Sequence, residues 1–118
     1  EADRIRRTLE DAGFNPPDLS ELLGSSPLPQ LVLKELLDLL VYRKELVKVA
    51  NDLYFHRTAI DTAERLLRDY FSANQSITVS QFRDLTKSSR KYALPILEYF
   101  DSCKLTRRIA DARVLLKV

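Results

Sequence analysis

Apolar side chains in residues 1–41 recur at the three- and four-residue spacing of amphipathic helices. This spacing predicts three helices, from about Ile5 to Gly13, from Leu19 to Leu23 with Gly24 closing it, and from the Pro27–Pro29 turn to about Val41. The pattern changes over residues 43–56, where apolar residues flank Asn51 and Asp52, a pair typical of tight turns. We therefore expect two short antiparallel strands in that segment.

The second half of the chain predicts the same order of elements. A helix is expected from Thr58, whose spacing to Asp61 resembles a capping box, to about Phe71. Ser80 and Ser89 are placed at the N-caps of two further helices. The expected elements are then a minimal strand at 76–79, helices ending near Thr86 and Asp101, and strands at 105–109 and 113–118.

Shifting the sequence by 60 residues aligns these halves without a gap. Ser20 falls on Ser80, the segment 36–38 on 96–98, and the segment 48–51 on 108–111. Three helices followed by a two-stranded hairpin form the winged-helix variant of helix-turn-helix. The predicted fold is therefore mainly α with small β-hairpins, an α+β chain of two tandem winged-helix modules at residues 1–56 and 57–118.

Composition argues for a folded domain without a metal or cofactor. Of 118 residues, 45% are hydrophobic and 31% charged, which excludes a disordered chain. The single cysteine, Cys103, cannot form an internal disulfide, and is expected to be a small core residue at a helix end. His56, the one histidine, is expected to be a half-buried ring at a strand end. We predict no metal site and no cofactor.

No enzyme site emerges from the sequence. Gly13 and Gly24 are the only glycines, so the chain has no glycine-rich phosphate loop and no nucleophile elbow. The most apolar stretch, residues 28–41, contains charged residues and is too short to span a bilayer. Methionine is absent even at position 1, which we interpret as a sign that the chain is part of a longer protein.

Charge divides unevenly between the two halves. Residues 1–56 carry 7 basic and 10 acidic side chains, whereas residues 57–118 carry 12 basic and 7 acidic ones. An asymmetry of this kind suggests that the second half meets a polyanion.

A basic cluster, Lys87-Ser88-Ser89-Arg90-Lys91, spans a turn and the first turn of the following helix. Cations are unfavourable there, because the positive end of the helix dipole opposes each by roughly 0.3 to 1 kcal/mol unless an anion is bound. Free backbone N–H groups, two hydroxyls and three cations instead form a phosphate site. The cluster could otherwise be only a solvated turn.

The second predicted hairpin adds cations to this surface. Arg107 and Arg108 are consecutive, so on a strand at most one of them shares a face with the helix start. Arg113 lies across the turn from them, Lys104 and Lys117 extend the positive zone, and Tyr92 could stack on an unpaired base.

The first module is an internal control for this site. Sixty residues before Ser89-Arg90-Lys91 it has Pro29-Gln30-Leu31, which lacks the cations. Its third helix is apolar around most of its circumference, which we interpret as burial against another module. We therefore assign the first module a spacer role and the second the ligand-binding role.

The run ITVSQFRDLTKSSRKYALPILEYFDSCKLTRR, which starts at Ile77, resembles the end of SelB, the bacterial selenocysteine-specific elongation factor family. The segment SRKYALPILEYFD followed by LTRR is its most specific part. The resemblance covers residues 77–116 and is mainly architectural over the first half. It implies that the chain is the final two winged helices of such a factor, without the GTPase part.

The resemblance also implies a ligand, a location and a set of contacts. In that family the last winged helix holds the selenocysteine insertion stem-loop of the mRNA, so we expect a cytoplasmic, monomeric, non-catalytic RNA-binding chain that meets the ribosome only through the full-length factor. Because a narrow RNA major groove excludes a recognition helix, contacts are expected to a bulged base and to phosphates. The expected RNA-binding residues are Lys87, Ser88, Ser89, Arg90, Lys91, Tyr92, Arg107, Arg108 and Arg113.

Two other functions fit the same residues. A DNA-binding transcription regulator would use the same basic helix start in a major groove, commonly as a dimer. A tandem winged-helix protein-interaction module would instead use the apolar third helix as its interface, with a salt-insensitive partner.

Overall fold

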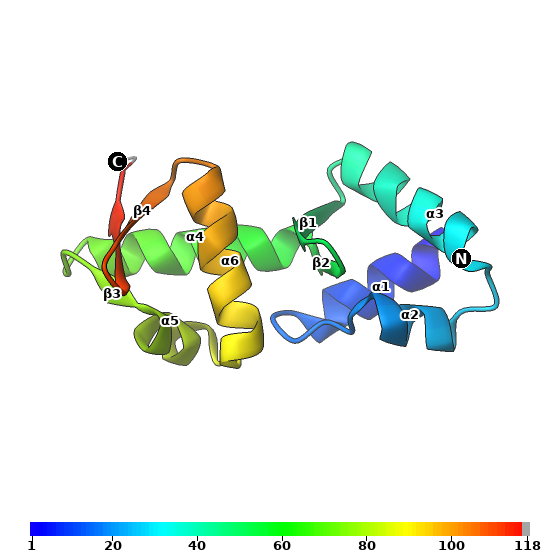
Figure 1. The fold of residues 1–118 in the computed structure, drawn as a ribbon, viewed down its shortest axis with the longest axis horizontal. Coiled ribbons are helices and arrows are strands. Elements are labelled where there is room, and N and C mark those ends of the chain that lie inside the picture. Colours follow the sequence, from blue (N-terminus) through cyan, green and yellow to red (C-terminus); the bar gives the residue numbers. More distant parts are fainter. Residues whose placement is uncertain (117–118) are drawn as a thin grey trace. The chain divides into compact units, whose positions relative to one another are not determined.

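A computed structural model of the chain describes residues 1–116. It is mainly helical with two small antiparallel sheets, so the predicted α+β winged-helix class is confirmed (Figure 1). The elements are α1 (Ala2–Ala12), α2 (Leu19–Ser25), α3 (Gln30–Tyr42), β1 (Leu46–Ala50), β2 (Leu53–His56), α4 (Arg57–Phe71), β3 (Ile77–Thr78), α5 (Val79–Thr86), α6 (Arg90–Ser102), β4 (Thr106–Ile109) and β5 (Ala112–Leu115). Two compact units divide the chain, Glu1–Ile60 and Asp61–Val118.

Local signals set the limits of the first helices. Gly13 follows α1 with φ 58°, in the left-handed region that favours glycine. Asp18 caps α2 by accepting from the Glu21 N–H at 2.9 Å, while the Glu21 carboxylate accepts from the Asp18 N–H at 3.1 Å. The prediction that Gly24 closes α2 is wrong. The helix continues through Ser25 and ends at the extended Ser26, immediately before Pro27.

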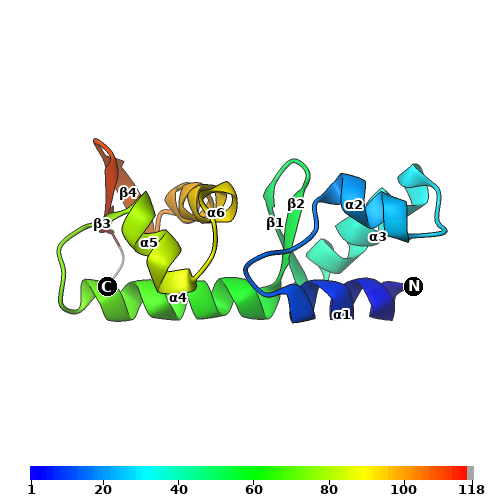
Figure 2. The same ribbon diagram turned by 90° about the horizontal axis from the view of Figure 1, so that it is seen from below.

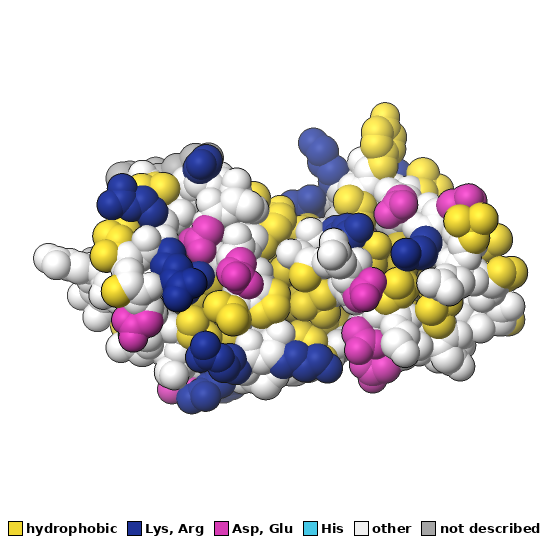
Figure 3. Space-filling view, viewed as in Figure 1, with side chains coloured by type: hydrophobic (Ala, Val, Ile, Leu, Met, Phe, Trp, Pro, Cys, Tyr) yellow, Lys and Arg dark blue, Asp and Glu magenta, His cyan; other side chains and the backbone are white. Residues whose placement is uncertain are grey.

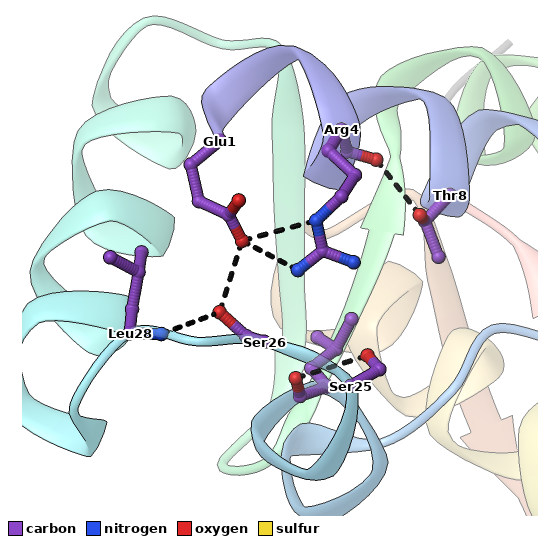
Figure 4. A network of polar contacts seen from close by, with 7 residues as sticks. Glu1, Arg4, Thr8, Ser25, Ser26 and Leu28 are labelled. Carbon is purple, nitrogen blue, oxygen red and sulfur yellow. Dashed lines mark hydrogen bonds and ion pairs between the residues drawn. The ribbon is translucent and has the colours of Figure 1, made fainter.

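A polar network ties the start of α1 to the turn between α2 and α3 (Figure 4). Arg4 donates two hydrogen bonds to one Glu1 oxygen, at 2.5 and 3.1 Å, and the Ser26 hydroxyl donates to the same oxygen at 3.0 Å. The Ser26 hydroxyl also accepts from the Leu28 N–H at 3.2 Å. Arg4, by hydrogen bonding, lowers the pKa of the Glu1 carboxyl.

One face of each helix of the first unit packs into its hydrophobic core. Its buried members are Ile5, Leu9, Leu19, Leu22, Leu33, Leu37, Leu40, Leu46 and Tyr54. Only one face of α3 contributes, since Leu31, Val32 and Leu39 are exposed in this unit. The core of the first unit therefore uses one face of α3, and burial of its remaining apolar surface against another module stays a prediction.

The predicted duplication is visible in the backbone. In the first unit the N–H groups of Arg43, Lys44 and Glu45 donate to the carbonyls of residues 39, 41 and 40, and in the second unit residues 103, 104 and 105 donate to 99, 101 and 100. Lys44 and Lys104 both adopt a positive φ, 62° and 63°. The same turn therefore leads from helix to hairpin in both units.

The helix α4 begins differently from the prediction. His56 Nδ1 accepts from the Thr58 N–H at 3.2 Å and lies 2.8 Å from the Thr58 hydroxyl, in place of the expected capping box with Asp61. His56 is half-buried at the end of β2, as predicted. The division between the compact units falls at Ile60, inside α4.

In the second unit a three-stranded sheet, in the order β3-β5-β4, stands with α5 and α6 on one side of α4 (Figure 2). Thr78 caps α5 by accepting from the Gln81 N–H at 3.1 Å, and Gln81 accepts from the Thr78 N–H at 2.9 Å. The placement of the cap at Ser80 is therefore wrong, because the T-x-x-Q capping box begins two residues earlier. Strand β5 pairs with both neighbours, which fixes the hairpin against the start of α5.

Two further expectations concern the end of the chain. Cys103 lies at the end of α6 as predicted, but it is exposed and is not a core residue. Leu105 and Thr106, which follow it, supply the buried side chains instead. Lys117 and the predicted end of the last strand lie outside the described residues. None of the described helices combines the length and apolar character needed to cross a membrane.

Candidate nucleic-acid interface

The start of α6 presents two unpaired backbone donors with two cations. Ser89 is the N-cap, and its carbonyl accepts from the N–H groups of Tyr92 and Ala93 at 3.1 and 2.9 Å. The N–H groups of Arg90 and Lys91 have no acceptor among the described residues, and both side chains are exposed. No acidic side chain offsets the helix dipole in this first turn. The helix start is therefore suited to an anion.

The turn before α6 is held by its own hydrogen bonds. Lys87 ends α5 in the left-handed region, with φ 56°, and is exposed. The half-buried Ser88 hydroxyl lies 2.8 Å from the hydroxyl of Thr86, which donates to the Phe82 carbonyl at 3.0 Å. Ser88 therefore supports the turn from inside, and Ser89 is the more exposed of the two hydroxyls.

Tyr92 stands beside this cluster and is half-buried. The Lys91 ammonium lies 5.3 Å from the centre of the Tyr92 ring, within the range of a cation–π contact. One face of the ring is thus shared with a cation, which leaves less of it for a stacked base.

The hairpin separates its two adjacent arginines. Arg108 pairs across the strands with Arg113, and its Nε donates to the Ala110 carbonyl at 2.8 Å. Arg107 pairs with Val114 and so points to the opposite face. The turn has no glycine, and Ala110 adopts its left-handed conformation, with φ 57°. Arg108, not Arg107, shares a face with the start of α6.

Arg113 has a different role from the one predicted. Its side chain is buried, and its Nε and Nη2 donate to one Asp101 oxygen at 3.2 and 3.1 Å. The other Asp101 oxygen accepts from Thr106 at 2.6 Å. Direct contact of Arg113 with RNA is therefore corrected to a structural role, because its guanidinium is committed to an ion pair that ties α6 to the hairpin.

A hollow of about 190 Å³ lies between α5, α6 and the hairpin. Arg90 and Arg108 line it together with two carboxylates, Glu98 and Asp111. Its remaining lining residues are Thr78, Val79, Ser80, Leu94 and Arg113. Figure 3 shows Lys and Arg side chains gathered over this part of the second unit. The hollow offers donors and acceptors within one small space, which suits a group that carries both.

Several lining residues were not foreseen from the sequence. Glu98 follows Arg90 and Leu94 at four-residue steps, so helical spacing alone would have placed all three on one face of α6. Asp111 and Ser80 have no such signal, since they reach the hollow only through the pairing of β5 with β3 and β4. Within residues 1–116, no group of His, Cys, Asp and Glu has the arrangement of a metal site.

Known proteins resemble this chain in both sequence and fold. The family model described as "Elongation factor SelB, winged helix" matches residues 69–115, which contain the basic helix start and the hairpin. A selenocysteine-specific elongation factor from Desulfomicrobium baculatum is 36% identical over 113 residues. The predicted resemblance to the winged-helix region of SelB is confirmed.

The match to the Desulfomicrobium factor covers 96% of this chain but only 18% of that protein's length. The mRNA-binding domain of SelB from E. coli, solved in complex with SECIS RNA, matches with a TM-score of 0.83 at 24% identity, over 98% of this chain and 97% of that one. A bacterial selenocysteine-specific elongation factor structure matches with a TM-score of 0.75 at 21% identity, over 98% of this chain and 18% of that one. These two structures establish the fold that this chain shares.

Proposed function

We propose that this chain is a non-catalytic mRNA-binding module of a selenocysteine-specific elongation factor, and that it holds the selenocysteine insertion stem-loop. The main support for this proposal is that Arg90 and Arg108 line the same hollow, beside the N–H groups of α6 that have no acceptor among the described residues. A SelB mRNA-binding domain of the same fold was solved with such an RNA, which supports this choice of ligand.

Phosphate groups of the stem-loop would lie at the start of α6. The N–H groups of Arg90 and Lys91 point out of the helix there, and their side chains add two positive charges. Lys87 and Ser89 extend the same surface, Ser88 supports the turn beneath it and Tyr92 borders it, while Arg107 would meet the RNA backbone from the opposite face of the hairpin.

An unpaired base would enter the hollow. Its ring nitrogens, amino groups and carbonyls require both donors and acceptors, which Arg90, Arg108, Glu98 and Asp111 supply. Base pairs inside a duplex do not expose these edges in the narrow major groove of RNA. The hollow would therefore discriminate a bulged stem from a continuous one.

The two modules would divide this work. Residues 57–118 bind the RNA, and residues 1–56 act as a spacer whose α3 begins with Gln30 and Leu31 in place of Arg90 and Lys91. The chain binds as a monomer and reaches the ribosome through the remainder of the factor, which also carries any GTPase activity.

Fluorescence anisotropy with three labelled nucleic acids tests this function. The chain would be titrated against an RNA stem-loop with a bulged base, the same stem without the bulge, and a DNA duplex of equal length, at two salt concentrations. Preference for the bulged stem-loop is expected. Equal or tighter binding to DNA would point to a transcription regulator, and no binding to any of them would favour a protein-interaction module.

Two variants test whether the hollow is responsible for the preference for the bulged stem-loop. Glu98→Gln should reduce the discrimination between bulged and continuous stems, because its carboxylate lines the hollow without adding positive charge. Asp69→Asn is the matched control, since Asp69 is an exposed carboxylate of the same unit on α4 and does not line the hollow. An equal loss of discrimination in both variants would exclude the hollow as the reading site.

A further inference from the structure

The exposed face of α3 carries an apolar stripe that the first unit leaves uncovered. Leu31 is 69% exposed, Val32 43%, Leu39 48% and Tyr42 83%. These residues recur at helical spacing along one side of α3, opposite the buried Leu33, Leu37 and Leu40. Figure 3 shows hydrophobic side chains over α3 with both acidic and basic side chains among them. Contiguous apolar surface of this kind marks an interaction site more often than an isolated exposed leucine does.

Comparison with the second unit shows that this stripe is a specialisation. At the positions 60 residues later, Leu31 and Tyr42 are replaced by the exposed polar residues Lys91 and Ser102. The same two helices therefore present opposite chemistries from the same position in the duplicated fold. Where α6 is suited to an anion, α3 is suited to an apolar surface.

Acidic residues determine which apolar partner fits. Glu35 is exposed inside the stripe, four residues after Leu31. Asp38 is exposed at its edge, four residues before Tyr42 and four residues after the exposed Lys34, the one cation of α3. Among the described residues neither carboxylate forms an ion pair. A helix that covered the stripe with neutral or acidic flanks would leave both charges desolvated and unpaired, which is costly. A helix flanked by Lys or Arg would pair with them.

A second copy of this chain is a poor occupant for the same reason. In an antiparallel pair of α3 helices, the register that sets Leu31 against Tyr42 also sets Glu35 against Asp38 of the other copy. A parallel pair sets each acidic residue beside its own copy. Both arrangements bring like charges together in a partly dehydrated interface.

We propose that α3 is a docking surface for a basic amphipathic helix of a protein partner, which lays its apolar face on Leu31, Val32, Leu39 and Tyr42 and pairs cations with Glu35 and Asp38. Helix-in-groove recognition of this kind reads apolar anchors at helical spacing and uses flanking charge for specificity. Through this surface the first unit would bind a protein partner independently of the RNA site.

Two synthetic helical peptides of the length of α3 form the direct test. Both carry the same leucine stripe, and they differ only in whether lysine or glutamate flanks it. Anisotropy titration of the whole chain should show binding of the lysine peptide only. Leu39→Ser combined with Tyr42→Ser should weaken it about tenfold or more, because anchor residues dominate such interfaces. Asp84→Asn, an exposed carboxylate of the second unit, should leave it unchanged.

Charge variants and oligomeric state complete the test. Glu35→Gln combined with Asp38→Asn should weaken binding of the lysine peptide and strengthen binding of the glutamate peptide. The proposal is overturned if both peptides bind equally, if neither binds, or if binding survives the loss of Leu39 and Tyr42. Sedimentation that shows a dimer abolished by Tyr42→Ser would also overturn it, by assigning α3 to a second copy. Circular dichroism verifies that the variants are folded.

Discussion

At the scale of single residues, arginine has three roles in the second unit. Arg90 is exposed at a helix start, Arg108 curls over the hairpin turn, and Arg113 is buried against Asp101. All three belong to the same basic region of the sequence, where residue type alone makes them equivalent candidates for phosphate contact. Their surroundings separate the exposed Arg90 and Arg108 from the buried Arg113.

Arg90→Ala and Lys91→Ala should each weaken binding of the bulged stem-loop by roughly 1 to 3 kcal/mol while the fold stays intact. Each removes a cation from a site that already concentrates positive potential. Gln30→Ala is the matched control, since Gln30 occupies the equivalent place at the start of α3. Anisotropy titration measures the change, and a comparable loss in the Gln30 variant would contradict the division of roles between the modules.

Asp101→Ala should lower the free energy of unfolding by about 3 kcal/mol, because it leaves the guanidinium of Arg113 buried without its partner. Chemical denaturation measures the loss. Asp101→Leu combined with Arg113→Met should recover most of it, since no buried charge remains. A double variant as unstable as Asp101→Ala alone would show that the pair is not the cause.

At the scale of elements, the two units use the same turns and helices with different surface chemistry. The turn after α3 repeats after α6 with identical hydrogen-bond spacing. The sheets differ, because the second unit adds β3 to its hairpin while the first unit retains one hydrogen bond in the corresponding place, from the Leu19 N–H to the Asp52 carbonyl at 3.1 Å.

The hairpin of the first unit predicts a specific pH dependence. Burial, with smaller contributions from Asp38 and Asp52, raises the pKa of Tyr54 above its usual 10.0. The folded chain therefore holds this proton more tightly than the unfolded chain does. Its contribution to stability is complete below pH 10 and is lost as the pH rises through the folded pKa. Denaturation of wild type and Tyr54→Phe across this range should show a smaller decline in the variant, and parallel curves would exclude Tyr54.

At the scale of the whole molecule, charge asymmetry matches the proposed division of function. The basic excess lies in residues 57–118, together with the hollow and the free helix start. The acidic excess lies in residues 1–56, together with the apolar stripe on α3. A small net charge of +2 for the chain conceals these two distinct surfaces.

Stem-loop affinity should fall steeply with salt, because each phosphate that the chain neutralises releases counterions. The combined Arg90→Ala and Lys91→Ala variant should reduce the slope of log affinity against log salt by roughly 2, about one for each phosphate that is no longer neutralised. Anisotropy titrations at several salt concentrations measure this slope. A flat profile in the wild type would be inconsistent with a phosphate site.

Helical periodicity, the 60-residue duplication and the basic helix start were determined by the sequence alone, because each depends on neighbours within a few turns of the chain. Three features depended on tertiary structure. Pairing of β5 with its neighbours brought Asp111 to the hollow, burial committed Arg113 to Asp101, and the limits of the first core left Leu31 and Tyr42 exposed. These outcomes depend on contacts between residues distant in sequence, and periodicity carries no information about which side of an element the neighbouring elements will cover.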